Sequence, residues 1–480
     1  MKVKEVIKDL QVKKVIGSLE GEVKDVCIDS NFVVSGSLFI CIKGGKFDGH
    51  LFCAQAEKYG AVAIVCERQL RTTLPQIIVE NTRKAMCHIA SNFYNNPEKE
   101  LKIVGITGTN GKTTTAHLIS KVLNESGVTA GVIGTLGTFF KDVELEANLT
   151  TPDPIVLYKI FRDMVDKGVK VAVMEISAHA SYLDKLEGLT FECGIFTNLT
   201  QDHLDFFQNM ENYAKAKQDF FIKNKINNVI LNSDDALGVD ISKKVSNPIL
   251  YGIDNPADVF AIDIEQLKDN THFVVNIFDE IFITKIKLKG RFNVYNYLAC
   301  ATACYLLGVS PKEIVTALEK IQYINGRLEL VYQGEFDVYV DYAHTPDGLR
   351  KSLSAIKEIC PKRLICVFGC GGNRDSDKRD KMGEISGEIA DFTVITSDNP
   401  RFEEPMEIIW QIEKGVLRKT KNYIIVQERE QGIEYAINLA KKGDVVLVAG
   451  KGSEKYQEVF GIKKPYNDKD TIDKIIRGKK

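Results

Sequence analysis

The chain has 480 residues, too many for one hydrophobic core, and the usual size of domains predicts about three of them. Its 63 Lys and Arg residues nearly balance 65 Asp and Glu residues, so a net charge of −2 gives no electrostatic case for a nucleic-acid or membrane-surface partner. No apolar run approaches the ~20 residues of a membrane span, and residues 1–5 lack the apolar core of a signal peptide. We therefore expect a soluble cytoplasmic protein.

The eleven cysteines are odd in number and form no CxxC pair. Many lie inside apolar runs such as residues 38–42. This pattern is typical of small buried apolar side chains in a reducing compartment, and it argues against disulfides or a zinc site.

The first hundred residues alternate short strands with turns, which predicts a small α/β unit. Strand patterns at residues 36–42 and 61–66 flank a helical pattern at residues 52–59. The Asn-Asn-Pro-Glu segment at residues 95–98 marks a boundary, because the residue before proline is disfavoured in a helix. We take residues 1–99 as a first domain.

The next segment alternates buried strands with helices. A β-branched strand at residues 101–107 runs into a glycine turn, and an amphipathic helix at residues 112–126 follows. Further strand patterns occur at residues 169–174, 193–197 and 228–231. This alternation predicts a doubly wound, mostly parallel sheet with helices on both faces, over residues 100–327.

After Gly326 and Arg327 the alternation restarts, which predicts a third, Rossmann-like α/β domain over residues 328–480. The expected elements are a helix near residues 348–359 and strands at residues 336–340, 363–368, 391–395 and 445–448. We expect the charged end of the chain to be a frayed tail.

The strongest local motif lies between the strand and the helix of the central segment. Glycines let backbone N–H groups face phosphate oxygens, Lys112 can reach the terminal phosphates, and Thr113 can bind Mg²⁺. Ile106 stands where the standard motif has glycine. The alternative is a strand-to-helix turn with an accidental Lys-Thr pair. The motif residues are Gly108, Thr109, Asn110, Gly111, Lys112, Thr113 and Thr114.

Acidic and histidine side chains follow two further strands. Glu175 directly follows one strand, where doubly wound folds place ligands, so it is a candidate Mg²⁺ ligand or a solvated loop acid. Asp202, His203 and Asp205 follow another strand and resemble a second metal or substrate site, although a structural histidine fits equally well. Lys217 has the pattern of a lysine on a helix surface.

Together these segments resemble the Mur ligase family over nearly the whole chain. The matching motifs are Gly-Thr-Asn-Gly-Lys-Thr-Thr at residues 108–114, a Glu after a strand, Asp-His-Leu-Asp at 202–205, Phe-Asn-x-x-Asn at 292–296, Gly-Arg at 326–327 and Asp-Tyr-Ala-His-Thr-Pro-Asp at 341–347. The resemblance implies a central ATP-binding domain between a UDP-substrate domain and an amino-acid-binding domain. The match is strongest to the members that add the third residue of the stem peptide.

The resemblance also implies roles for individual residues. Lys112, Glu175, His203 and Lys217 would be catalytic, with Lys217 carbamylated. Thr113, Glu175, His203 and Lys217 would hold Mg²⁺. Residues 108–114 with Asn296, Arg327 and Asp341 would bind ATP. Substrates would contact Ser30, Gly45, Lys46, Phe47, Thr150, Thr151, Ser177, Lys185, Arg374, Asp398, Asn399, Pro400, Arg401, Gly450 and Glu454.

The implied reaction joins a diamino acid to UDP-N-acetylmuramoyl-L-alanyl-D-glutamate through an acyl phosphate, with release of ADP and phosphate. The Asp-Asn-Pro-Arg segment at residues 398–401 indicates meso-2,6-diaminopimelate, because a guanidinium can bind its second carboxylate with two hydrogen bonds. The alternative for Arg401 is a surface arginine after a turn. The resemblance implies a role in cell-wall synthesis and cell division, and we expect a monomer.

The chain departs from the family pattern mainly where the muramoyl substrate would bind. The differing residues are Asn31, Leu149, Ala178, Leu183, Lys185, Phe207 and Ser453. They leave open the same ligation with L-lysine, or a diverged ligase that acts on another acid. A nucleotide-gated binding protein without catalysis is a further alternative.

Overall fold

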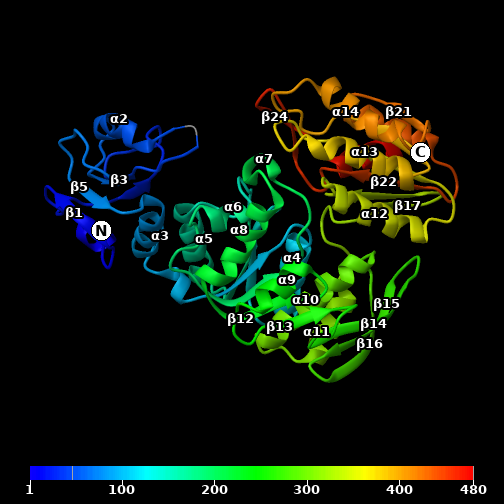
Figure 1. The fold of residues 1–480 in the computed structure, drawn as a ribbon, viewed down its shortest axis with the longest axis horizontal. Coiled ribbons are helices and arrows are strands. Elements are labelled where there is room, and N and C mark those ends of the chain that lie inside the picture. The colour runs from blue at the N-terminus through cyan, green and yellow to red at the C-terminus, as the bar shows by residue number, and fades with distance from the viewer. Residues whose placement is uncertain (46, 479–480) are drawn as a thin grey trace. The chain divides into compact units, whose positions relative to one another are not determined.

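The structure is a computed structural model that describes residues 1–45 and 47–478. Figure 1 shows the helices and strands of the chain in order of residue number. The chain divides into two compact units. Unit 1 consists of Met1–Thr107, Gly127–Gly194 and Ala216–Val229. Unit 2 consists of Gly108–Ser126, Ile195–Lys215 and Ile230–Lys480.

Unit 1 begins with the small α/β fold that the first hundred residues predict. Its sheet has the order β1-β5-β4-β3-β2, in which only β1 pairs antiparallel. Alternate residues of β3 enter different clusters, since Leu38 packs on one face and Phe39 on the other. The elements are α1 Val3–Val6, β1 Val12–Ile16, β2 Asp25–Cys27, β3 Ser37–Ile40, α2 Cys53–Lys58, β4 Ala63–Cys66, β5 Gln76–Val79 and α3 Thr82–Phe93.

The rest of unit 1 contains strands in the order β9-β8-β7-β10-β6, followed by β11 and β12, whose last residues belong to unit 2. Strand β10 pairs parallel with both β6 and β7, and all five of its residues are buried. This confirms the predicted parallel arrangement. The elements are β6 Lys102–Thr107, β7 Ala130–Gly134, β8 Gly137–Phe140, β9 Val143–Leu145, α5 Pro154–Asp166, β10 Val171–Glu175, α6 Ala178–Tyr182, β11 Thr190–Phe196, α8 Met210–Lys223 and β12 Lys225–Asn232.

In unit 2, helix α10 is buried on all sides, because small residues such as Ala299, Ala301 and Ala303 let neighbouring elements approach closely. The unit also holds an antiparallel extension, β14-β15-β16, which the sequence analysis did not predict. The elements are α4 Lys112–Glu125, α7 Leu204–Phe207, α9 Ala236–Ser242, β13 Ile249–Gly252, β14 Val259–Gln266, β15 Thr271–Ile277, β16 Glu280–Ile286, α10 Arg291–Leu306 and α11 Pro311–Lys320.

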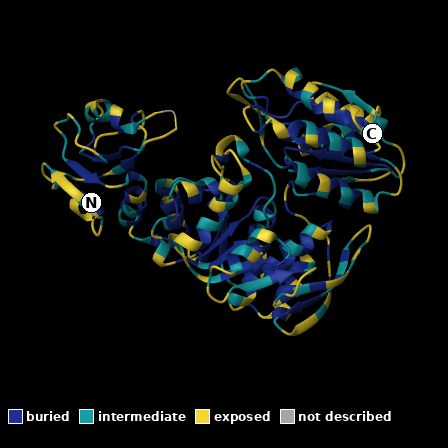
Figure 2. Ribbon diagram, in the orientation of Figure 1, coloured by how far each residue is buried: buried dark blue, intermediate teal, exposed yellow. Residues whose placement is uncertain are grey.

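The remaining part of unit 2 is the predicted Rossmann-like fold. Its sheet has the order β17-β18-β22-β19-β20-β21, and only β17 pairs antiparallel. Buried strands lie between helices with exposed outer faces (Figure 2). The elements are β17 Glu329–Gln333, β18 Asp337–Asp341, α12 Pro346–Ile359, β19 Leu364–Phe368, α13 Asp377–Ile389, β20 Phe392–Ile395, α14 Pro405–Leu417, β21 Tyr423–Ile425, α15 Arg429–Leu439, β22 Val445–Ala449, β23 Tyr456–Val459 and β24 Ile462–Pro465.

The expectation of a frayed charged tail is wrong. Residues Asp468–Gly478 form helix α16, whose Ile472 and Ile476 pack into the core beside Val338. The charged residues occupy the outer face of an amphipathic helix, and its apolar stripe is widely spaced in sequence. None of the described helices combines the length and apolarity needed to cross a membrane.

Candidate active site

The phosphate loop connects β6 to α4, and its lysine folds back over the loop. Lys112 Nζ donates to the carbonyl oxygens of Gly108 at 2.9 Å and Thr109 at 2.8 Å. The ammonium group is therefore held above the loop backbone, at the N-terminal end of α4. A helix N-terminus and a positioned ammonium group are both suited to a polyphosphate.

Two glycines allow this loop to approach its surroundings closely. Gly108 has φ of +144°, and an added Cβ would lie 1.8 Å from Thr197 Oγ1. Gly111 has φ of +88°, and a Cβ there would lie 2.5 Å from Asn296 Oδ1. Ile106 lies fully buried within β6, so the turn begins two residues later than the standard motif requires. The departure at Ile106 therefore leaves the loop intact.

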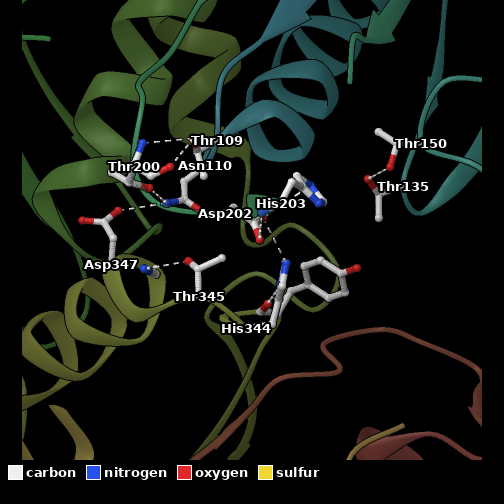
Figure 3. A network of polar contacts seen from close by, with 12 residues as sticks. Thr109, Asn110, Thr135, Thr150, Thr200, Asp202, His203, His344, Thr345 and Asp347 are labelled. Atoms are coloured by element: carbon white, nitrogen blue, oxygen red, sulfur yellow. Dashed lines mark hydrogen bonds and ion pairs between the residues drawn. The ribbon is translucent and has the colours of Figure 1, made fainter. Parts of the chain in front are cut away.

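The end of strand β11 holds the loop in shape. Thr197 Oγ1 donates to the Asn110 carbonyl oxygen at 2.7 Å. The Asn198 side chain donates to the same oxygen at 3.0 Å and accepts from the Asn110 N–H at 3.0 Å. Asn110 Nδ2 also donates to Asp347 Oδ2 at 2.8 Å (Figure 3). The Thr109 N–H donates to the Asn198 carbonyl oxygen at 2.8 Å, so the segment after β11 fixes the loop through both backbone and side-chain bonds.

The predicted nucleotide residues from the second half of the chain divide into two groups. Arg327 Nη2 donates to Thr113 Oγ1 at 2.8 Å, and its guanidinium lies over the Tyr342 ring. Asn296 accepts from Thr115 Oγ1 at 3.3 Å, so both residues contact the start of α4. Asp341 instead accepts from the Leu328 N–H and from a serine hydroxyl, and burial raises the pKa of its carboxyl. Asp341 thus fixes the backbone at Leu328, directly after Arg327, by accepting its N–H.

His203 belongs to a charged cluster after strand β11. It adopts φ of +56° and caps α7, and its Nε2 lies 3.4 Å from Asp202 Oδ2. His344 Nε2 lies 3.9 Å from the same carboxylate (Figure 3). Burial opposes ionisation of Asp202, but the neighbouring His203, His344 and Lys378 hold the pKa of its carboxyl below the ordinary value. Asp205 lies on α7, two residues after His203.

Glu175 is the last residue of β10 and is 1% exposed. Its carboxylate accepts from the Thr135 N–H at 2.8 Å and from Thr135 Oγ1 at 3.1 Å. A Cβ at Gly134 would lie 2.1 Å from Glu175 Oε1, so the close approach of these strands requires glycine. The carboxylate is therefore fixed in position rather than solvated in a loop.

Three predicted substrate residues gather around Glu175 in unit 1. Thr151 Oγ1 donates to the Glu175 carbonyl oxygen at 2.9 Å and accepts from the Ser177 N–H at 2.9 Å. The hydroxyls of Thr150 and Thr135 share a hydrogen bond of 3.2 Å (Figure 3). This cluster of hydroxyl groups is suited to a polar, oxygen-rich ligand.

Two lysines of unit 1, Lys185 and Lys217, are buried and do not lie on the surface. Lys185 Nζ lies 2.8 Å from Asp153 Oδ1, and the lysine side chain is 9% exposed. Lys217 is 1% exposed, so the interpretation of a lysine on a helix surface is wrong. Lys217 does lie on a helix, α8, but the face of α8 that carries it packs inward. A buried ammonium group is unusual outside functional sites.

The predicted uridine loop is tied at both ends. Gly44 N–H donates to the Phe47 carbonyl oxygen, and Arg83 donates to the Lys43 carbonyl oxygen at 2.8 Å. Phe47 is 71% exposed, which suits contact with a ligand. Ser30 is buried and donates to Gln55 at 3.1 Å. Lys46 lies outside the described residues.

The predicted amino-acid site gathers at the carboxyl ends of β20 and β22. Asn399 Nδ2 donates to Glu454 Oε2 at 2.9 Å. Lys451 is fully buried, and its Nζ donates to Asn399 Oδ1 and to Glu454 Oε2, each at 2.9 Å. A Cβ at Gly450 would lie 2.6 Å from Asp398 Oδ2. The Asp-Asn-Pro-Arg segment at residues 398–401 and the Gly-Lys-Gly-Ser-Glu segment at residues 450–454 therefore meet at this end of the sheet.

Arg401 is held in an uncommon conformation, with φ of +53°. Its backbone pairs with the hairpin β23–β24, since its N–H donates to the Glu458 carbonyl oxygen at 3.1 Å. Its Nη1 donates to the Gly372 carbonyl oxygen at 2.8 Å. Arg374 is exposed beyond the same glycine loop. Strained backbone at an arginine is typical of a ligand site.

Comparison with known proteins decides the family. A diaminopimelate-adding ligase of Clostridium acetobutylicum, "UDP-N-acetylmuramoyl-L-alanyl-D-glutamate–2,6-diaminopimelate ligase 1", is 43% identical over 484 residues, which cover 99% of each chain. The corresponding ligase of Alkaliphilus oremlandii is 41% identical over 483 residues, with 99% of each chain covered. The chain belongs to the Mur ligase family. Mur ligases are ATP-dependent amide ligases, and the phosphate loop belongs to such an enzyme.

Family models and solved structures agree with this assignment. The Mur ligase family catalytic domain matches residues 22–98, the Mur ligase middle domain residues 106–304 and the Mur ligase glutamate ligase domain residues 326–452. A solved diaminopimelate-adding Mur ligase has a TM-score of 0.71 at 27% identity and covers 100% of this chain and 99% of that chain. The MurF ligase of Thermotoga maritima, solved with ADP, has a TM-score of 0.63 at 19% identity, over 96% and 99% of the chains, and shares the fold.

The candidate site also contains residues that the sequence did not indicate. Thr135 orients Glu175, Asp153 pairs with Lys185, and Lys451 joins Asn399 to Glu454. Lys451 could have been found from its place in the Gly-Lys-Gly-Ser-Glu segment. Thr135 and Asp153 carry no such local signal, because their partners are distant in sequence.

The donors present are compatible with Mg²⁺. In unit 1, Glu175 offers a fixed carboxylate, and in unit 2, Thr113 offers a hydroxyl; each by itself is a hard oxygen donor of the kind that this ion prefers. Within the described ranges, no three His, Cys, Asp or Glu side chains form a closed metal cage. Mg²⁺ commonly binds through one or two carboxylates together with substrate phosphates and water, so the donor chemistry of each of these residues fits the ion.

Proposed function

We propose that the protein joins meso-2,6-diaminopimelate to UDP-N-acetylmuramoyl-L-alanyl-D-glutamate with the consumption of ATP. The observation that carries this proposal is the meeting of Asn399, Glu454 and the loop that holds Arg401 at one end of the C-terminal sheet. A guanidinium and a carboxylate at one site complement the second carboxylate and ammonium of a diamino acid. The names of the full-length relatives support the same substrates.

The reaction needs two displacements. A carboxylate oxygen of the dipeptide attacks the γ-phosphorus of ATP, the bond to the bridging oxygen breaks, and ADP leaves. The amine of diaminopimelate then attacks the carbonyl carbon of the acyl phosphate, loses a proton, and expels phosphate as the C–O bond breaks. The protein would contribute chiefly by alignment and by neutralising charge on the phosphoryl oxygens.

We assign the phosphate step to the loop. Lys112 and the amides of residues 108–114 would bind the phosphates, and Asn296, Arg327 and Asp341 would position the nucleotide. Bound Mg²⁺ would neutralise charge on the phosphates. Its proposed ligands are Thr113, Glu175, His203 and a carbamylated Lys217, whose burial suits conversion of the cation to a carboxylate.

The other substrates are assigned to the remaining predicted residues. The muramoyl-dipeptide would be bound by Thr150, Thr151, Ser177 and Lys185. Lys185 would pair with a substrate carboxylate in place of Asp153. Ser30, Gly45 and Phe47 would bind the uridine end, while Arg374, Asp398, Asn399, Pro400, Arg401, Gly450 and Glu454 would bind the diamino acid. The domains would be residues 1–99, 100–327 and 328–480. A cytoplasmic monomer acting in cell-wall growth and division fits these substrates.

An amino-acid panel tests the proposal. Phosphate release is expected only when the muramoyl-dipeptide and an amino acid are both present. Meso-diaminopimelate should exceed lysine and ornithine in kcat/KM by at least about 100-fold, because lysine leaves the guanidinium groups unpaired. Faster turnover with lysine would overturn the amino-acid assignment. ATP hydrolysis at the same rate without either substrate would reject the ligase assignment. No turnover, together with a mass measurement that shows no carbamyl group on Lys217, would favour a nucleotide-gated binding protein. Activity only with a different acid would indicate a diverged acceptor.

A further inference from the structure

Gly371, Gly372 and Asn373 form a glycine loop after β19. Side chains outside this loop make hydrogen bonds with all three residues. Arg379 Nη2 donates to the Gly371 carbonyl oxygen at 3.3 Å, and Arg401 Nη1 donates to the Gly372 carbonyl oxygen at 2.8 Å. The Asn373 N–H donates to Glu403 Oε1. The exposed Arg374 directly follows Asn373, so these contacts fix the backbone just before it.

The loop also lies against the Asp-Asn-Pro-Arg segment without intervening side chains. The Gly372 N–H donates to the Asn399 carbonyl oxygen at 2.9 Å. A Cβ at Gly372 would lie 1.9 Å from the Pro400 carbonyl oxygen, and one at Gly371 would lie 2.9 Å from Arg401 Nη1. Any shift of the loop would therefore move Arg374 and Arg401 relative to one another.

Arg379 is the central residue of this arrangement and is 1% exposed. Its Nη1 donates to Glu403 Oε2 at 2.8 Å and to Gln411 at 3.0 Å, while Nη2 donates to Glu403 Oε1 at 3.0 Å. This two-pronged pair holds the pKa of the Glu403 carboxyl below its usual range, against the effect of burial. Glu403 therefore stays charged and accepts from the Asn373 N–H at the same time.

The base of the arrangement is a tightly packed helix pair. Arg379 lies in the first turn of α13, and Gln411 lies on α14. A Cβ at Gly383 would lie 2.0 Å from the Ile412 carbonyl oxygen, and one at Gly415 would lie 1.8 Å from the Asp380 carbonyl oxygen. The two helices thus touch backbone to backbone, which gives Arg379 a rigid support.

We propose that Arg379 is a positioning residue for the amino-acid site, which acts through Glu403 and the glycine loop to fix the spacing of Arg374 and Arg401. The inference rests on the proposed function, because it assumes that these two arginines bind the second carboxylate of the diamino acid. Arg379 itself is buried behind the loop and does not touch substrate. A planar carboxylate accepts paired hydrogen bonds only from correctly placed guanidinium groups, so their spacing determines affinity and selectivity.

The test compares Arg379→Lys and Glu403→Gln with Arg363→Lys as the matched control. Arg363 makes a similar paired contact with Asp444, but both residues precede β19 and β22 and so lie at the opposite end of the same strands. The KM for meso-diaminopimelate should rise about 10-fold or more in Arg379→Lys and Glu403→Gln. The KM for ATP and for the muramoyl-dipeptide should change less than about 2-fold, and the control should leave all three unchanged.

The outcomes separate this inference from the proposed function. If the unaltered enzyme does not use diaminopimelate, the proposed function fails. If it does, but both variants keep their KM for diaminopimelate, the positioning role is overturned. An equal loss across all three substrates would also overturn it, because a general structural role would act in that way. Glu403→Gln keeps the inference testable if Arg379→Lys does not fold, since Glu403 is partly exposed and its amide keeps the same shape.

Discussion

At the phosphate loop, residue identity is dictated by backbone conformation and by distances of a few ångströms. Gly108 and Lys112 could be predicted from the sequence, because the motif is local and each residue has one physical role. Thr135 and Asp153 could not, because they act on partners 40 and 32 residues away that only the folded sheet brings near. Lys217 was misread for a related reason: helical spacing gives the period of α8 but not which face is covered.

Gly108→Ala tests the requirement for close approach. The added Cβ would lie 1.8 Å from Thr197 Oγ1, so the loop must shift and ATP turnover should fall by at least about 100-fold. Gly127→Ala is the control, because Gly127 also has positive φ, at +81°, but has open space around its Cβ position. The alanine there should cost only about 1 kcal/mol of stability. Equal activity of the two variants in a phosphate-release assay would contradict the assigned loop geometry.

At the scale of elements, parallel strands with continuous apolar runs were predicted well. Strands β6, β19 and β22 match their expected positions within two residues, since burial on both faces leaves a clear pattern. The extension β14–β16 was missed because its alternation is weak and polar residues interrupt it. Helix α16 was mistaken for a tail because charged residues outnumber its apolar stripe.

The pair of Arg429 and Asp468 is expected to hold α16 on α15. Both side chains are fully buried, and two N–H groups of the guanidinium donate to the carboxylate at 2.7 Å each. Arg429→Met leaves a buried carboxylate without its partner and should lower the free energy of unfolding by about 3–5 kcal/mol. Arg429→Met combined with Asp468→Asn removes both charges and should cost less than the single change.

Urea unfolding followed by fluorescence measures this effect. Trp410, the single tryptophan of the chain, lies half-exposed on α14 in the same fold and reports its unfolding. A double variant less stable than Arg429→Met would contradict the idea that the cost comes from the stranded charge.

At the scale of the whole molecule, the residues proposed for the nucleotide and those proposed for the acceptor are distributed between the two units. In unit 2, the phosphate-loop segment contacts Arg327 through Thr113 and Asp347 through Asn110. Unit 1 holds Glu175 and the hydroxyl cluster proposed for the acceptor. The order of motifs along the chain predicted the fold and the family. The acceptor could not be predicted with the same sharpness, because the departures from the family pattern lie where no single residue type is required.

The central claim is that the γ-phosphoryl group of ATP passes to an acceptor carboxylate before the amide forms. An acceptor labelled with oxygen-18 in its glutamate carboxylates tests this directly, with the released phosphate analysed by mass spectrometry. The account predicts one oxygen-18 atom in each phosphate released with meso-diaminopimelate present, and no labelled phosphate from Lys112→Ala, which lacks the ammonium group above the loop. Peptide formation with unlabelled phosphate, or full activity of Lys112→Ala, would contradict it.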